Sequence, residues 1–159
     1  MEQHSDSAIS ASESTTSSDW PRPRKGAGVD VAVTHLLIVR DVARSRHFYA
    51  DVFDAHVLME GVPSILRFYN TWLVLSEEGG PTDDKPDILA VAPQDARTLT
   101  SALNLRVADI YEVYERWRAR GAEFLTPPKV HDAEIRCYLR DPDGYLIEVG
   151  QTTQMPNAS

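Results

Sequence analysis

A single glutamate, Glu148, interrupts an apolar run near the end of this 159-residue chain, in the segment "GYLIEVGQ". A β-strand here would place Leu146, Glu148 and Gly150 on one face and the alternate apolar residues on the other. A carboxylate among apolar residues needs a cation, a hydrogen-bond donor or a proton as its partner. Glu148 is therefore the first candidate for a base, an acid or a metal ligand.

Two further strand-like segments carry polar side chains with the same alternation. Asn104 and Arg106 alternate with apolar residues in "LNLRV", and Arg136, Tyr138 and Arg140 do so in "EIRCYLR". Guanidinium groups and an amide close to one glutamate suit a polar or anionic small molecule. The alternative is an Arg–Glu network that satisfies itself and binds no ligand.

Three other residues have both a chemical and a structural interpretation. His131 precedes a strand and is either an acid or base near neutral pH or a solvent-exposed loop residue. Trp72 is either one wall of a binding site or a core residue. Cys137 falls on the apolar side of its strand, which predicts a buried and unreactive thiol.

The elements that would position these residues occur twice. In the first copy, the strand "VAVTHLLIV" leads to a helix capped by Asp41 and then to three strand-like runs. In the second copy, the strand "SALNLRV" leads to a helix that is capped by Asp109 and ended by Gly121, and then to three more strand-like runs. The two capping aspartates are 68 residues apart (109 minus 41). The pattern predicts an α+β fold of two tandem βαβββ modules, 29–78 and 100–152, joined by a linker, 79–99, in a single domain, 29–153.

Composition narrows the classes of partner. The net charge of −8, without a basic stripe, argues against nucleic acid. One cysteine allows no intrachain disulfide and favours a reducing, cytoplasmic location. No apolar run approaches the roughly 18 residues of a membrane span. Residues 1–28 are rich in serine and poor in apolar side chains, which predicts a disordered N-terminal tail.

The duplicated unit, with "RDPDGYLIE" and "VRDVARSRHFYADVF", resembles the vicinal oxygen chelate superfamily over about residues 30–152. This is the group of glyoxalase I, extradiol dioxygenases, fosfomycin-resistance enzymes and bleomycin-binding proteins. The resemblance implies a cupped mixed β-sheet with helices outside, a metal or small ligand in the cup, and a homodimer. It places Glu148 where the family has its last metal-binding glutamate.

The same resemblance implies an incomplete metal site. His35 is one residue away from the family's usual position, Thr34, and a one-residue step reverses the face of a strand. The other matching positions hold residues that do not bind metals: Ala102 or Leu103, and Val74. His35 and Glu148 alone leave a divalent metal short of ligands, so we expect no tightly bound cofactor unless His131 moves in.

Three functions fit these expectations. The first is a glyoxalase-type enzyme in which a cation at Glu148 polarises a carbonyl oxygen. The second is a metal-free lyase or isomerase in which Glu148 moves a proton and Arg106 stabilises an oxyanion. The third is a non-catalytic protein that sequesters a small molecule. An extradiol dioxygenase is less expected than a lyase or isomerase, and the fold alone does not select a chemistry.

Overall fold

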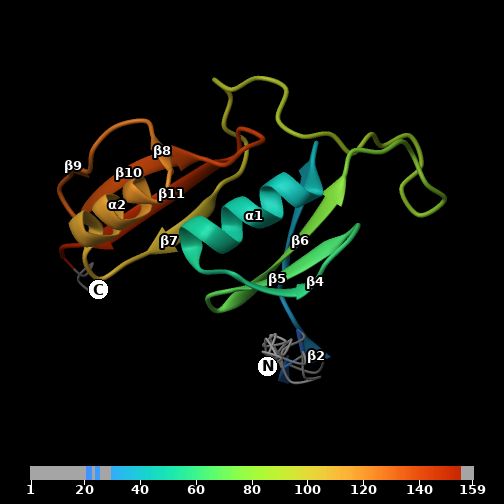
Figure 1. The fold of residues 1–159 in the computed structure, drawn as a ribbon, viewed down its shortest axis with the longest axis horizontal. Coiled ribbons are helices and arrows are strands. Elements are labelled where there is room, and N and C mark those ends of the chain that lie inside the picture. The colour runs from blue at the N-terminus through green and yellow to red at the C-terminus, as the bar shows by residue number, and fades with distance from the viewer. Residues whose placement is uncertain (1–20, 23, 26–29, 155–159) are drawn as a thin grey trace, which may run out of the picture.

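The structure is a computed structural model that describes residues 21–22, 24–25 and 30–154 (Figure 1). The N-terminal module contains β3 (His35–Val39), α1 (Val42–Phe53), β4 (His56–Met59), β5 (Ser64–Phe68) and β6 (Thr71–Glu77). The C-terminal module contains β7 (Leu103–Arg106), α2 (Ile110–Ala119), β8 (Glu123–Phe124), β9 (Lys129–Val130), β10 (Glu134–Arg140) and β11 (Leu146–Thr152). Two short strands, β1 (Arg24–Lys25) and β2 (Asp30–Val31), precede them. The predicted α+β fold of two tandem modules is confirmed.

Each module forms its own mixed sheet. The strand order is β3-β6-β5-β4 in the first sheet and β7-β11-β10-β8 in the second, where β9 also pairs with β10. In both sheets the first strand of the module runs parallel to the last strand and forms one edge. No backbone pairing joins the two sheets within the described residues, so the modules are held together by side chains.

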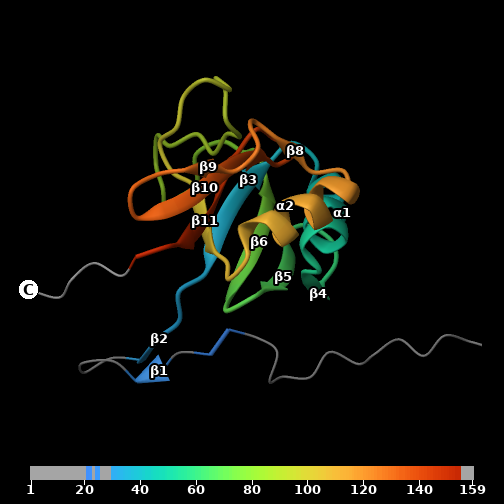
Figure 2. The same ribbon diagram turned by 90° about the vertical axis from the view of Figure 1, so that its left-hand side faces the viewer.

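Both helices lie on the same side of the sheets (Figure 2). Asp41 starts α1 by accepting a hydrogen bond from Arg44 N at 2.9 Å, and Asp109 starts α2 in the same way. The rings of Phe53 and Trp117, one from each helix, meet edge to face with centroids 4.6 Å apart. The two modules therefore share one apolar core on the helix side, and the opposite face of each sheet has no helix over it.

The turn between β10 and β11 joins the modules through two buried aspartates. Asp143 accepts hydrogen bonds from Ser45 Oγ at 2.8 Å and from Arg40 N at 2.9 Å, and Asp141 accepts one from Tyr49 Oη at 3.0 Å. Arg44 adds an ion pair to Asp143 at 3.1 Å. We call this set the acidic clasp. It explains why a buried serine and tyrosine face the second module from α1.

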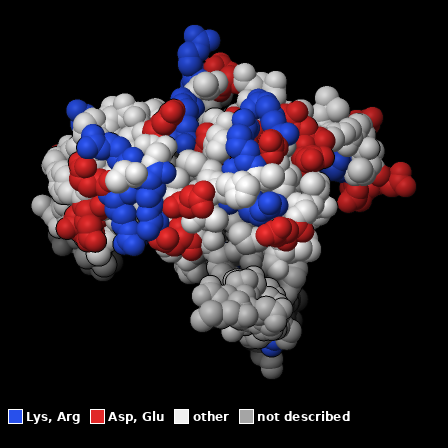
Figure 3. All heavy atoms as spheres, in the orientation of Figure 1, with Lys and Arg blue, Asp and Glu red and all other residues white. Residues whose placement is uncertain are grey.

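The remaining segments need only brief description. The predicted linker, 79–99, contains no helix or named strand, and its backbone pairs with itself through Gly79 and Ala90. Most of the predicted tail, 1–28, falls outside the described residues. No helix among the described residues is long and apolar enough to cross a membrane. On the helix side, basic and acidic side chains are interspersed rather than gathered by sign (Figure 3).

Candidate functional site

Polar side chains cover the helix-free face of the second sheet. We call this surface the polar face; its residues are Asn104, Arg106, Glu134, Arg136, Tyr138 and Glu148. Strand register arranges them in rows across the sheet, because directly paired residues point to the same side. Neighbouring rows are two residues, or about 7 Å, apart along the strands. Apart from Glu134, these are residues that the sequence analysis expected to share one face.

The first row contains Glu148 in the centre, with Asn104 and Tyr138 on the two neighbouring strands. Asn104 Nδ2 donates to Glu148 Oε1 at 2.5 Å, and the Tyr138 hydroxyl donates a short hydrogen bond to Glu148 Oε2. The bond to the carboxylate raises the pKa of Tyr138 above its usual value, since loss of its proton would place two negative oxygens together. Glu148 is thus held by two neutral donors and has no cationic partner among the described residues.

The next rows contain two arginines that share a different carboxylate. Arg106 Nη1 and Arg136 Nη1 each lie 2.9 Å from an oxygen of Glu134, and Arg106 Nη2 also donates to Thr152 Oγ1 at 2.8 Å. The hydrogen bond from Arg106, followed by that from Arg136, lowers the pKa of Glu134. Two guanidinium groups and one carboxylate leave this group with a net positive charge. Their free N–H groups can therefore still donate hydrogen bonds to an anionic or polar ligand.

Gly150 makes this arrangement possible. It lies between Arg106 and Arg136 in its row, and the Arg106 side chain crosses directly above it. A Cβ atom at this position would lie 2.1 Å from Arg106 Nη1 and 2.8 Å from Arg106 Cζ. Glycine is therefore required here by a close approach of a side chain, and not by an unusual backbone angle.

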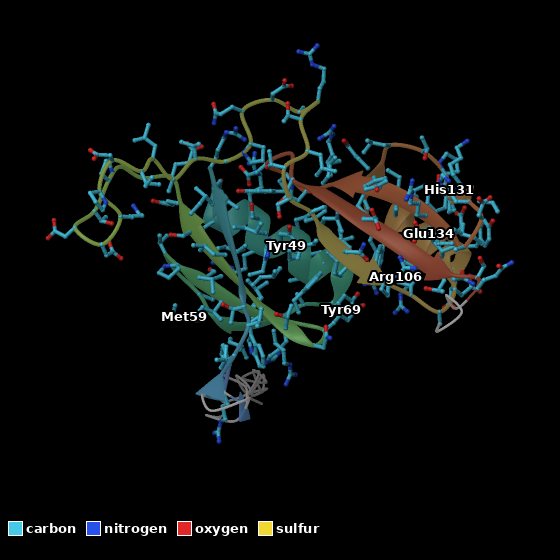
Figure 4. All side chains as sticks on the ribbon, turned by 180° about the vertical axis from the view of Figure 1, so that it is seen from behind. Tyr49, Met59, Tyr69, Arg106, His131 and Glu134 are labelled. Atoms are coloured by element: carbon cyan, nitrogen blue, oxygen red, sulfur yellow. The ribbon has the colours of Figure 1, made fainter. Side chains whose placement is uncertain are left out.

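The polar face is open rather than deeply cupped. The Arg106, Arg136 and Glu134 side chains are 43%, 39% and 25% exposed. His131 lies beside this group in the chain before β10, where its N–H donates to Glu134 O at 2.8 Å, and it lines a shallow cavity of about 430 Å³ with Arg106 and Glu134. Figure 4 shows Arg106, Glu134 and His131 together on the face seen from behind. The structure thus brings His131 close to the arginines, but shows no side-chain contact between His131 and Glu148.

Three other candidate residues have other positions or other partners. Trp72 is on β6, in the sheet of the N-terminal module, and is half-buried there. Arg140 uses its guanidinium to bind the backbone oxygens of Gly144 and Ala96, so it braces its own turn and the linker. Cys137 is buried on the opposite side of β10, and this burial raises the pKa of its thiol to about 11. A thiol with so high a pKa is a poor nucleophile at neutral pH.

His35 occupies the helix side of its strand. It alternates in phase with Leu37 and Val39, which are buried beneath α1, whereas Glu148 alternates out of phase with the buried Ile147 and Val149. Partial burial lowers the pKa of His35 because it disfavours the charged imidazolium. The structure therefore directs His35 and Glu148 toward opposite sides of their sheets.

The donor set does not fit a bound divalent metal. Among the described residues, no group of three or more His, Cys, Asp or Glu side chains lies close enough together to hold an ion. The face that carries Glu148 offers it an amide and a phenol, and the matching positions from the other strands are Thr34, Val74 and Ala102. A divalent cation of the zinc or manganese type needs more oxygen and nitrogen ligands than this.

Sequence reasoning missed Glu134 and the role of Gly150. The signal for Glu134 was present, since "EIRCYLR" places it two residues from Arg136 and on the same face. Both arginines pair with Glu134 and not with Glu148. This choice depends on the register of three strands, which a single sequence does not display. The close approach of Arg106 to Gly150 depends on the same register.

Comparisons with known proteins agree with this fold. The family model described as the Glyoxalase/Bleomycin resistance protein/Dioxygenase superfamily matches residues 31–149. No curated protein matches the chain. A glyoxalase/bleomycin resistance protein/dioxygenase from Nocardioides is similar in structure, with a TM-score of 0.66, 20% identity, and coverage of 84% of this chain and 92% of that one.

Fosfomycin-resistance proteins are also similar in fold. FosX from Listeria monocytogenes, in complex with Mn(II) and sulfate, has a TM-score of 0.59 and 20% identity, covering 79% of this chain and 92% of that one. FosX from Mesorhizobium loti has a TM-score of 0.56 and 17% identity, covering 79% and 94%. At these identities the likeness concerns the fold alone.

Proposed function

Because the chain belongs to the Glyoxalase/Bleomycin resistance protein/Dioxygenase superfamily, we propose that it binds a small polar or anionic molecule on its polar face, where Glu148 accepts and returns a proton as in a lyase or isomerase. The observation that supports this most is the contrast between the two carboxylates of that face. Glu134 is held by two arginines, whereas Glu148 is held only by Asn104 and Tyr138. A carboxylate without a cationic partner is available to a ligand's proton.

The rest of the polar face supplies the complementary charge. An anionic ligand group would bind to the free guanidinium N–H groups of Arg106 and Arg136, one row from Glu148. A carbon–hydrogen bond adjacent to that group would then lie near Glu148, because the rows are about 7 Å apart. Tyr138 and Asn104 keep the carboxylate oriented and can donate to an oxygen on which negative charge develops.

A bound cation is not part of this proposal. FosX from Listeria monocytogenes was crystallised with Mn(II), but the described part of this chain contains no group of three His, Cys, Asp or Glu side chains that could hold a metal ion. The proton transfer described here uses only side chains of the chain itself. The single buried cysteine is in keeping with a reducing, cytoplasmic environment.

We also propose that the protein is a homodimer. Val31, Val33 and Leu36, on the chain leading into and along β3, are 54%, 79% and 57% exposed. A row of exposed apolar side chains beside an edge strand is a surface that proteins usually cover. A second copy that covers these residues would also enclose part of the open sheet faces.

The second candidate function is sequestration without catalysis. The openness of the polar face favours it, because a site that excludes water poorly gives weak electrostatic stabilisation of a reaction intermediate. The two functions differ in whether Glu148 exchanges a proton with the ligand's carbon or only accepts hydrogen bonds from the ligand.

Pyruvate and methylphosphonate are suitable probes, since both are small anions and pyruvate has exchangeable methyl protons. In titrations of the ¹⁵N-labelled protein, both should shift the Asn104 side-chain amide and the backbone amides of residues 104–106 and 148–150. Shifts confined to the first sheet would contradict the proposed site. In D₂O, faster loss of the pyruvate methyl protons would support proton transfer, and binding without exchange would support sequestration.

A further inference from the structure

A cavity of about 570 Å³ lies between the two modules, along the free edge of β7 and away from Glu148. Its walls are the end of β7, the first turns of α2, and the tight turn between β5 and β6. Figure 4 labels Tyr69, in that turn, and Arg106, on β7, which belong to different modules. The volume falls in the range of ligand-binding sites in proteins, about 300–1,000 Å³.

The internal repeat relates this cavity to the acidic clasp. The clasp residues Arg40, Arg44, Ser45 and Tyr49 correspond, 68 positions later, to Ala108, Glu112, Val113 and Trp117. All four of these later residues line the cavity. The cavity is therefore the second copy of a junction that is closed in the first copy.

Loop length explains why one junction is closed and the other is open. Residues 141–145 connect β10 to β11 and insert Asp141 and Asp143 against α1. Only Tyr69 and Asn70 connect β5 to β6. A two-residue turn does not extend far enough to reach α2, so the corresponding space stays open.

Backbone groups of β7 face this space without a partner. Val107 N donates to Gly150 O at 2.9 Å, so the N–H and C=O groups of Arg106 and the N–H of Ala108 point to the free edge. In the first module the equivalent groups are satisfied, because Ile38 O accepts from Tyr145 Oη at 3.1 Å and Arg40 N donates to Asp143 Oδ1. Within the described residues, Arg106 O and Ala108 N have no such bond.

The first three amides of α2 are occupied within the fold. Ile110 N donates to Gln151 Oε1, and the amides of Tyr111 and Glu112 donate to Asp109 Oδ1. Val113 N closes the first helical hydrogen bond with Asp109 O. The amides of the first three helical residues, which a helix usually leaves free, are thus occupied.

One acidic side chain of the cavity has no basic partner. Arg106 shares Glu134 with Arg136, and Arg116 shares Asp54 with Arg120, which lies 2.8 Å from it. Glu112 has replaced the clasp arginine, Arg44, and its carboxylate makes no ion pair or hydrogen bond in the described part of the chain. Glu112 is therefore the lining carboxylate that is open to a cation, at the position where the clasp has the arginine that holds Asp143.

We propose that this cavity is a second binding site, which takes a small organic amine with an apolar or aromatic body. The ammonium group binds Glu112 and the carbonyl of Arg106, and the apolar body packs against Trp117, Val113 and the ring of Tyr69. The site shares Asn104 and Arg106 with the polar face, but it does not depend on the function proposed there.

The test uses 2-phenylethylamine as probe and the uncharged 2-phenylethanol, of nearly the same shape, as its control. Titration of the ¹⁵N-labelled full chain should shift the Ala108 amide and the Trp117 indole N–H, with the amine binding at least about tenfold more tightly than the alcohol. Glu112→Gln should remove this advantage. Glu115→Gln, on the same helix but paired with Arg118 and outside the cavity, should retain it.

Three results would overturn the proposal. They are equal binding of amine and alcohol, shifts confined to residues outside the cavity, and unchanged amine binding by Glu112→Gln. Glu112 is exposed, so its replacement should leave the fold intact, which circular dichroism of the variant would check. Release of monomer on adding the amine would show that a second copy of the chain occupies the cavity, and would overturn it as well.

Discussion

Two glutamates of the second sheet differ in role because their neighbours differ. Glu134 faces two guanidinium groups, which lower its pKa and hold both of its oxygens. Glu148 faces a phenol and an amide, which orient its oxygens without neutralising its charge. Salt bridges of this solvent-exposed kind contribute little to stability. Glu148 is therefore the carboxylate of the polar face that can react with a ligand, and Glu134 serves to position the arginines.

A third carboxylate makes stability depend on pH. Burial, as the largest cause, raises the pKa of Asp141 to about 6. An unfolded aspartate ionises near pH 4, so between about pH 4 and 6 the folded protein keeps a proton that the unfolded chain has lost. This group therefore favours the folded state as pH falls from 7 to 5, by about 1 kcal/mol.

The measurement is urea unfolding of the parent and of Asp141→Asn at pH 7, 6 and 5. The variant lacks this titration, so the difference in unfolding free energy between the two proteins should move in the parent's favour as pH falls. Parallel pH profiles for the two proteins would show that the pKa of Asp141 in the folded state is close to its ordinary value, despite its burial beside Tyr49 and Asp143. They would contradict the prediction.

At the scale of elements, the close contact between β7 and β11 depends on Gly150. Gly150→Ala should displace the Arg106 side chain, because the new methyl group would lie 2.1 Å from Nη1. Since Arg106 is the main cause of the lowered pKa of Glu134, that pKa should rise toward its ordinary value. A ¹³C NMR titration of the Glu134 carboxyl group measures this directly.

Gly79→Ala is the matched control, because a Cβ at Gly79 meets no atom within 4 Å. It should leave the titration of Glu134 unchanged. An unchanged titration of Glu134 in Gly150→Ala would mean that Arg106 reaches Glu134 in another side-chain conformation. The contact would then not require glycine at position 150.

Local sequence signals were sufficient for the elements themselves. Asp41 and Asp109 marked the starts of both helices, and Gly121, with φ of 93°, marks the end of α2 as predicted. Alternation placed the polar face on one side of the second sheet. The same signals could not show that Arg106 and Arg136 pair with Glu134, nor that β9 forms. Both depend on pairing between segments that are distant in the sequence.

For the whole molecule, duplication of the βαβββ module explains the architecture. The differences between the two modules explain where the two proposed binding sites lie. The two modules share strand order, helix caps and a common core, but only one has the acidic turn that closes its junction. Repetition of a motif is visible in sequence. The open second junction was not foreseen, because it depends on how far a two-residue turn extends in space.

The apolar side chains near β3 predict a homodimer in solution. Sedimentation at micromolar concentration should give twice the chain mass, and replacement of the 57%-exposed Leu36 by lysine should shift the protein toward monomer. A parent that sediments only as a monomer would remove this prediction. The matched control is lysine in place of the exposed Leu89, in the linker.

The central claim, that Glu148 makes the polar face a ligand site, is tested most directly by titrating Glu148→Gln with pyruvate. Glutamine keeps the shape and hydrogen bonds of the residue and removes its charge. No buried cation is left unpaired, so the unfolding free energy should change by no more than about 1–2 kcal/mol. Proton exchange of bound pyruvate should fall at least about tenfold, because glutamine cannot take up the methyl proton. Glu123→Gln, exposed on β8, should behave as the parent. Parent-like binding and exchange by a folded Glu148→Gln would contradict the claim.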